Sequence, residues 1–413
     1  MTFAQKTMNY MVACFMLSSS YIAVAQDTPP VESLRDLYAN NPAFRLTMDH
    51  ALENIQSPYN GAANPWLGKT FDDFCDFFND WFILLPINAG EPKDPTAFPP
   101  GQYVDEFVYV TQFAGFYYNN KFGQWIVGRN PGLDWSKEFV TDRGVFMDSQ
   151  DSTETIPQWM ADPTIHIEEY IVPPEGFQSF NEFFIRDLKP GTRQIASPTD
   201  DAVLVAPTDC VLNMVQALTP ETQIPTKLNQ KLNVSDLLNG SQYAQYFENG
   251  TAISCILLPN TYHHYHAVVS GTVVESKEDI AGAYWGIEDF EKFFNNGNIG
   301  YGYNYSVFEQ FRRGYVVIET SDYGYVAMVP VGLDTIGSVV FEEGLKKVTP
   351  ANPQPIYKGE KVGHFAYGGS MVITLIEQGI SSVTIPLGQQ IGVFGSKKPK
   401  ALPAKRTKKK RRE

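Results

Sequence analysis

The spacing of apolar positions changes character partway along the chain. Within residues 31–55 apolar side chains recur at helical spacing, and residues 72–82 carry a dense stripe of aromatic side chains. Such a face is typical of a helix packed against a core. From about Phe180 onward, short β-branched runs alternate with Gly, Pro and Asp turns, which is typical of antiparallel β-structure. The pattern predicts a helical first part followed by a β-rich second part.

The expected strands are short and closely spaced. They cover residues 202–206, 253–258, 267–275, 315–319, 325–331, 338–341, 372–376 and 383–385. Many short strands at this spacing favour a sandwich or barrel-like core. We therefore expect an α+β protein, with a mostly helical N-terminal domain over residues 26–175 and a β-rich, barrel- or sandwich-like domain over residues 176–396. The polar segment 147–153 is expected to form a turn or a helix cap.

The N-terminus has the pattern of a secretory signal. Lys6 precedes an apolar stretch, and Ala23-Val24-Ala25 fits an A-x-A cleavage site. The alternative is a single membrane anchor, but three consecutive serines beginning at Ser18 interrupt the apolar run. We expect residues 1–25 to be removed and the mature protein to be exported, either to a periplasm or by secretion.

Charge is distributed unevenly. The chain has a net charge of −14, yet residues 397–412 contain ten Lys or Arg and no acidic residue. Without that segment and Glu413, 22 basic residues face 45 acidic ones. An acidic body of this kind argues against nucleic-acid binding. The tail, residues 397–413, is expected to be disordered. It could remain solvated or make peripheral contact with an anionic membrane, to which each Lys or Arg contributes roughly 1 kcal/mol.

Cysteine usage indicates no disulfide framework. Outside the predicted signal the cysteines are Cys75, Cys210 and Cys255, an odd number without short spacings. We interpret them as buried thiols that form at most one bridge. Their spacing also provides no zinc site.

Three of the six histidines fall within four positions, as His263, His264 and His266. A metal site is one interpretation, but no cysteine or acidic ligand stands nearby at a familiar spacing, so we predict no metal. Structural histidines at a strand end and acid/base catalysis are the other two interpretations. Asp209, at the end of an apolar run, could cap a turn or orient a histidine.

Ser370 follows Gly368 and Gly369 and precedes an apolar β-type run. By itself, a Gly-Gly-Ser segment usually marks a turn. It could also expose a hydroxyl and a backbone bond at the start of a strand, because glycine tolerates strained backbone angles.

Ordered motifs over some 200 residues resemble those of phosphatidylserine decarboxylases, which are pyruvoyl-dependent enzymes. The matching segments are residues 179–193, 207–209, 262–266, 331–339 and 358–370. The N-terminal half more loosely resembles larger, apparently soluble relatives of that family, some of which decarboxylate aromatic amino acids. That likeness rests on residues 64–66, 146–149 and 173–177.

The resemblance implies self-cleavage between Gly369 and Ser370. In this scheme His266 acts as base on the Ser370 hydroxyl and Asp209 holds the histidine. The hydroxyl attacks the Gly369 carbonyl, the chain is cut, and Ser370 becomes a covalent pyruvoyl group that serves as electron sink for decarboxylation. His263 would protonate the substrate after CO₂ has left. No metal or diffusible cofactor is implied.

The chain departs from the family pattern at several positions. Met371 replaces the threonine after the cleavage serine, Cys210 replaces a glycine, and Thr261 and His264 replace Asp and Arg in the histidine motif. We expect phosphatidylserine to be the substrate and the protein to be a homo-oligomer. The alternatives are a soluble decarboxylase of a free amino acid, aromatic ones included, and a non-catalytic binding protein on the same fold.

Overall fold

The computed structural model describes residues 27–377 with several gaps. The gaps are residues 60, 88–103, 219–223, 226–230, 233, 259, 281, 283, 286–310, 333–337 and 367–369. The predicted signal peptide, the basic tail, the predicted strand 383–385 and Gly369 all lie outside the described residues.

Helices dominate the first part of the described chain, as the apolar spacing predicted. They are α2 (Pro29–Asn40), α3 (Pro42–Glu53), α4 (Phe71–Phe82), α5 (Val104–Tyr117), α6 (Lys121–Gly128) and α7 (Gly132–Met147). The periodic run at residues 31–55 forms two helices rather than one. Asn41 separates them, and its side chain accepts a hydrogen bond from the Phe44 amide to cap α3.

The aromatic stripe of α4 builds the core of the helical domain. Phe78 and Trp81 are fully buried and pack against Phe113 of α5 and Phe139 of α7. Trp285, from the second half of the chain, enters the same cluster with its ring centroid 5.2 Å from that of Trp81, and its indole N–H donates to Ser136 Oγ at 2.6 Å. The helical domain and the β-rich region therefore share one hydrophobic core.

Short helices connect the helical domain to the sheets. These are η1 (Gln150–Ser152), α8 (Ile156–Met160), η2 (Pro163–Ile165), η3 (Ile167–Glu169) and α9 (Phe180–Phe184). The polar segment 147–153 ends α7 and forms η1, in line with the predicted turn or cap. Within it, the buried Ser152 hydroxyl donates to Met147 O and accepts from the Phe180 amide. This serine therefore joins the end of α7 to the start of α9.

The second half contains antiparallel sheets. The large sheet consists of β1 (Val211–Ala217), β4 (Thr251–Leu257), β6 (Gly271–Ile280), β7 (Arg313–Glu319), β8 (Tyr325–Gly332), β10 (Gln354–Ile356) and β12 (Ser370–Ile376). Its strand order is β1-β4-β12-β8-β7-β6-β10. Because β1 and β10 are its two edges, the sheet is open, and the barrel-like alternative for this α+β fold is wrong.

A second sheet covers one face of the first. It has the order β5-β11-β9, from His264–His266, Lys361–Phe365 and Val339–Phe341. Apolar residues of both sheets form one buried cluster between them, so the sandwich-like expectation fits this part of the chain. The remaining elements are β2 (Ile224–Pro225), β3 (Lys231–Leu232), α10 (Val234–Leu237), η4 (Ala244–Phe247) and η6 (Glu343–Leu345).

Two of the strand predictions differ from the structure. Residues 202–206 form no strand; Val205 makes a single backbone bond to Val268 O, and turns surround it. The run predicted from residue 267 becomes a strand only at Gly271. In both places the apolar side chains are suited to a strand, but the backbone has no continuous ladder partner.

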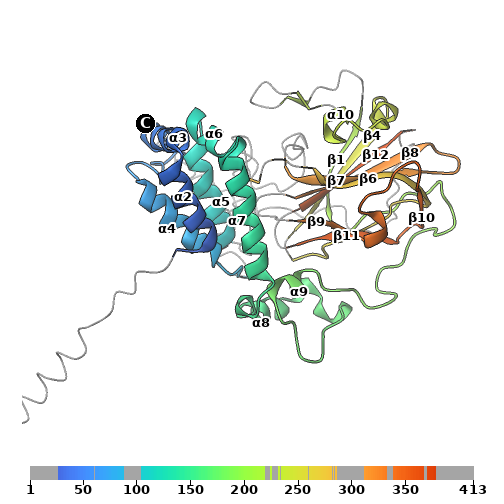
Figure 1. Ribbon diagram of the computed structural model, residues 1–413. Helices are drawn as coiled ribbons and strands as arrows, with labels where there is room; N and C mark the ends of the chain where they lie inside the picture. Colours follow the sequence, from blue (N-terminus) through green and yellow to red (C-terminus); the bar gives the residue numbers. More distant parts are fainter. Residues whose placement is uncertain are drawn as a thin grey trace, which may run out of the picture.

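The alternation of side chains along β12 decides which way Ser370 points. Met371, Ile373 and Leu375 belong to the core shared with the helices, whereas Val372 belongs to the cluster between the two sheets. Side chains two apart on a strand share a face, so Ser370 faces the small sheet with Val372. Figure 1 shows how the layers lie, with helices α2–α7 on one side and β9 and β11 below the large sheet.

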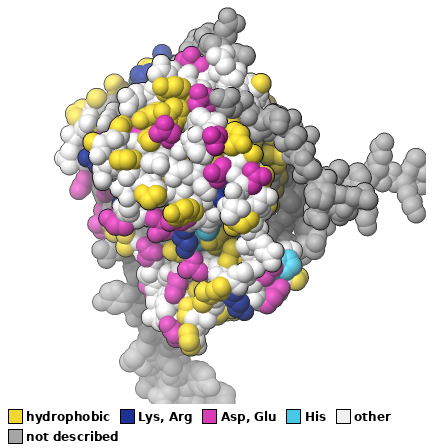
Figure 2. All heavy atoms as spheres, turned by 90° about the vertical axis from the view of Figure 1, so that its right-hand side faces the viewer, with side chains coloured by type: hydrophobic (Ala, Val, Ile, Leu, Met, Phe, Trp, Pro, Cys, Tyr) yellow, Lys and Arg dark blue, Asp and Glu magenta, His cyan; other side chains and the backbone are white. Residues whose placement is uncertain are grey.

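The face turned away from the helical domain is rich in acidic side chains. Figure 2 shows Asp and Glu scattered widely over it, with Lys and Arg fewer. This agrees with the acidic composition of the chain outside its basic tail.

Candidate active site

Ser370 is the first residue of β12, an interior strand of the large sheet. It lies opposite Leu257 of β4 and Gly332 of β8. Its side chain is fully buried, and Oγ has no hydrogen-bond partner among the described residues. A buried hydroxyl without a partner is costly, and such groups in native proteins often belong to functional sites.

His263 is the second buried group with an open polar atom. Its ring is stacked on Phe184, with centroids 3.7 Å apart. Nδ1 lies 2.9 Å from the Thr261 carbonyl oxygen. A carbonyl can only accept, so Nδ1 carries the hydrogen and Nε2 carries a lone pair. This Nε2 is buried without a partner among the described residues.

The environment of His263 keeps its imidazole neutral. The side chain is fully buried, and burial lowers its pKa well below the ordinary value, with a further contribution from the positive charge of Arg186. A neutral imidazole in a dry site is available to accept a proton near pH 7. His263 can therefore serve in proton transfer.

Chain connections place His263 and Ser370 in one corner of the molecule. Leu257, opposite Ser370, ends β4, and His263 follows six positions later. The His263 carbonyl accepts a hydrogen bond from the Phe365 amide at 3.1 Å, and Ser370 follows Phe365 by five positions. His263 directly precedes β5 and Ser370 begins β12, so each open atom lies at one end of a short connection between the same pair of sheets.

His266 has different partners from those that the sequence suggested. Its Nδ1 lies 2.8 Å from Gly359 O, and its Nε2 lies 2.9 Å from the Tyr262 hydroxyl. Burial lowers the pKa of this histidine too. Gly359 adopts φ +82°, a backbone conformation that favours glycine, and a Cβ there would lie 2.5 Å from Ile195 Cγ1. This turn directs the carbonyl toward His266.

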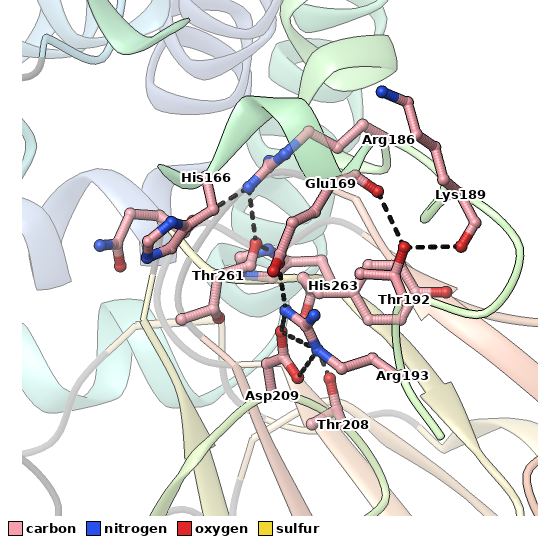
Figure 3. A network of polar contacts seen from close by, with 12 residues as sticks. His166, Glu169, Arg186, Lys189, Thr192, Arg193, Thr208, Asp209, Thr261 and His263 are labelled. Carbon is pink, nitrogen blue, oxygen red and sulfur yellow. Dashed lines mark hydrogen bonds and ion pairs between the residues drawn. The ribbon is translucent and has the colours of Figure 1, made fainter. Parts of the chain in front are cut away.

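Asp209 is paired with an arginine rather than with His266. Arg193 Nε lies 3.0 Å from Asp209 Oδ1, and its Nη2 lies 2.8 Å from Oδ2. The same guanidinium contacts Glu169 at 2.8 Å. Both ring nitrogens of His266 are taken by other groups, so Asp209 does not hold that histidine directly in this geometry. Figure 3 shows the Arg193 guanidinium between Asp209 and Glu169.

A second arginine supports the segment that leads into the histidine motif. Arg186 is buried, and its guanidinium carbon lies 4.2 Å from the Tyr170 ring centroid. Its Nη2 donates to Asn260 O at 2.9 Å and to Thr261 O at 3.3 Å. Residue-by-residue reasoning missed both arginines. Their signal was their place in the motif at residues 179–193, which alone could not say what they contact.

His264 lies in a charged cluster at the edge of the small sheet. Its Nε2 lies 2.7 Å from Ile185 O, and its ring centroid is 5.4 Å from that of His364. Burial lowers the pKa of His264 to about 4. Asp187 accepts a hydrogen bond from Lys361 at 2.7 Å, which holds its pKa below the ordinary value although burial acts in the opposite direction. Among the described residues no group of three or more His, Cys, Asp or Glu is arranged to hold a metal.

A cavity of about 230 Å³ lies close to the segment that precedes Ser370. Thr141, Gly144 and Asp148 of α7 and its end form one wall, and Asn181, Ser338 and Ala366 contribute others. Asn181 Nδ2 donates to Asp148 Oδ1 at 2.9 Å. The helical domain therefore supplies part of the surface next to the candidate site.

Comparison with known proteins agrees with this geometry. Residues 180–396 match the family described as "Phosphatidylserine decarboxylase", which is more than half of the chain. The chain belongs to the phosphatidylserine decarboxylase family.

Curated relatives carry the same name. The chain is 31% identical over 252 residues to phosphatidylserine decarboxylase proenzyme 2 of Oryza sativa, covering 59% of this chain and 37% of that protein. It is 28% identical over 267 residues to the proenzyme of Fusobacterium nucleatum, covering 64% and 80%. It is 29% identical over 260 residues to proenzyme 3 of Schizosaccharomyces pombe, covering 62% and 25%. The matched part thus spans about a third of the rice protein and a quarter of the yeast one.

The helices in the described part of the chain are all too short or too polar to cross a membrane.

Proposed function

We propose that this protein is a phosphatidylserine decarboxylase that cuts itself between Gly369 and Ser370 and uses a pyruvoyl group derived from Ser370. The observation that carries the proposal is the buried, unpartnered Oγ of Ser370 at the head of β12, in a region that matches the family. Ser370 fits the role of pyruvoyl precursor, because a group formed from it would remain buried and face the small sheet after the cut. Export through the predicted signal and membrane contact through the basic tail belong to the same proposal.

In the self-cleavage step, the Ser370 hydroxyl needs a base, because a neutral hydroxyl is a weak nucleophile. His266 has this role in the proposal. Its Nδ1–H is fixed by Gly359 O, which leaves Nε2 to receive a proton once the Tyr262 hydroxyl gives up its contact. The Arg193–Asp209 pair steadies the adjacent segment, whose Pro207 carbonyl accepts from the His266 amide at 2.7 Å.

In the decarboxylation step, His263 delivers the proton that replaces the departing carboxyl group. Because its resting imidazole is neutral with an open Nε2, that nitrogen first takes up a proton, for which the amine of the incoming substrate is the source. A pyruvoyl group supplies the electron-withdrawing carbonyl that such a reaction requires. The low pKa of His263 and its dry surroundings suit a group that exchanges a proton with substrate and not with water. Phe184, stacked on the ring, fixes its orientation.

Intact mass and CO₂ release test the proposal together. Purified wild-type protein should contain two chains, the smaller comprising the 44 residues from 370 to 413, with a pyruvoyl group at its start. Ser370→Ala should give one uncut chain and no activity. Vesicles containing phosphatidylserine should release CO₂, and free amino acids, aromatic ones included, should not. A single uncut wild-type chain would refute the cleavage, and activity on free amino acids alone would refute the substrate.

A further inference from the structure

Two thiols lie together beside the candidate site. Cys210 directly precedes β1, and Cys255 lies within β4. The register pairs Val211 with Ile256 and Leu212 with Cys255. Cys210 is therefore diagonal to Cys255 across the two strands and on the same face of the sheet, where neighbouring side chains can meet.

The two thiols are neighbours on that face. The Cys255 side chain, together with burial, raises the pKa of the Cys210 thiol above its ordinary value. Cys255 is buried and Cys210 is half-buried. Cys210 lies just outside the strand, so its backbone can adjust more readily than that of a residue within the ladder.

The thiol pair lies one strand away from Ser370. β12 pairs with β4 so that Ser370 faces Leu257 and Val372 faces Cys255. Cys255 is thus diagonal to Ser370 on the same face of the sheet. Cys210, in turn, follows Asp209, whose carboxylate is held by Arg193. A change in the thiol pair would therefore affect Ser370 through β4, and the Asp209–Arg193 pair through Cys210.

We propose that Cys210 and Cys255 form a reversible disulfide that slows the decarboxylase. A low-molecular-weight disulfide such as oxidised glutathione is the oxidant. One protein thiolate attacks it and releases one glutathione thiol, and the second protein thiol then displaces the other. The two cysteines lose two protons and two electrons, and the glutathione disulfide gains both to become two thiols. The export predicted from the N-terminus would place the protein where disulfides persist.

The slowing follows from geometry. A disulfide requires sulfur atoms about 2.05 Å apart, so the backbone at Cys210 must move toward β4. Asp209 moves with it and loses alignment with the Arg193 guanidinium. Displacements of about 1 Å near a reacting centre can reduce rates by up to about 100-fold. This effect on rate rests on the proposed function, whereas formation of the bond does not.

Full-length, processed protein should be equilibrated with glutathione from fully reduced to fully oxidised, then alkylated and mapped by mass spectrometry. We expect a peptide joining Cys210 to Cys255 and a fall in CO₂ release of roughly 10- to 100-fold, both reversed by dithiothreitol. Cys210→Ala should abolish the bond and the response while keeping the reduced protein's activity. Cys75→Ala, at a buried thiol of α4, should change neither.

Cys210→Gly, which restores the residue of the family pattern, provides a second variant if alanine disturbs folding. Absence of the linked peptide across the whole redox range would overturn the proposal. A linked peptide with unchanged CO₂ release would overturn its regulatory part. If the reduced protein released no CO₂ at all, the proposed function would fail, and the mass measurement would still decide whether the bond forms.

Discussion

In the helical domain, Asn120 is almost fully buried, and its side chain makes three hydrogen bonds, to Ala51 O, Phe116 O and the Gly123 amide. At the head of β12, Ser370 is equally buried, and its Oγ has no partner among the described residues; the same holds for His263 Nε2. These residues show two uses of a buried polar side chain. Asn120 fixes the surrounding backbone, whereas Ser370 and His263 each leave a polar atom open.

This difference separates structural from chemical uses of buried polarity. Leaving a buried polar atom unpaired costs about 1–3 kcal/mol, so a chain tolerates it mainly where another group must be met later. Changing Asn120 should therefore affect stability, and changing His263 should affect chemistry.

The largest expected effect belongs to His263. His263→Gln keeps a side chain of similar length but removes the ring nitrogen that transfers the proton. We expect two chains still to form, with CO₂ release lower by about 10²–10⁴-fold. Intact mass and a single-turnover assay measure the two quantities separately.

His266→Gln provides the matched comparison, because it should leave the chain uncut. If His263→Gln blocked cleavage and His266→Gln did not, the roles assigned to the two histidines would have to be reversed.

A smaller effect is expected at Asn120. Asn120→Ala leaves three buried backbone groups without their partner, so the free energy of unfolding should fall by about 1–3 kcal/mol. Urea titration measures this change, and the folded variant should retain its CO₂ release. Asn54→Ala removes an exposed amide that donates to His50 O, and should change stability by about 0.5 kcal/mol or less. Equal losses in the two variants would contradict the structural role of Asn120.

A further expected effect is a dependence of stability on pH. Burial lowers the pKa of His264 to about 4, below the value of about 6.5 for an exposed histidine. Between these two pKa values, His264 binds a proton in the unfolded chain but not in the folded chain. Stability should fall as pH drops below about 6.5 and level off near pH 4 as far as this residue is concerned. Urea midpoints across that range measure the slope, and His264→Asn should make it shallower, while the other buried histidines with lowered pKa, such as His263 and His266, maintain part of it. An unchanged slope in the variant would show that other groups cause it.

The sequence predicted elements better than it predicted contacts. The aromatic stripe at residues 72–82 became α4, and the apolar run at 372–376 became β12, because local periodicity reflects burial. The position of β12 between β4 and β8 depends on long-range pairing, which periodicity does not encode. The expected contact between Asp209 and His266 failed for the same reason, since nothing local shows that Arg193 reaches Asp209 first.

The site was partly predictable because chemistry limits the choice of residues. Scarce histidines in one short segment and a serine behind two glycines directed attention to His263, His266 and Ser370. Sequence could not show that the ring nitrogens of His266 are engaged while one of His263 is open. That distinction arises from Tyr262 and Gly359, whose positions depend on the folded sheets.

All seven residues of β12 are buried, and the strand is hydrogen-bonded to β4 on one side and β8 on the other. The proposed cut falls at its first residue. The shorter piece would therefore stay bound, because its first strand pairs with β4 and β8 and packs into both hydrophobic cores. Dilution would not separate the two pieces, because separation would require the hydrogen bonds between β12 and its neighbours β4 and β8 to break. The protein would become a two-chain assembly without ever having had to assemble.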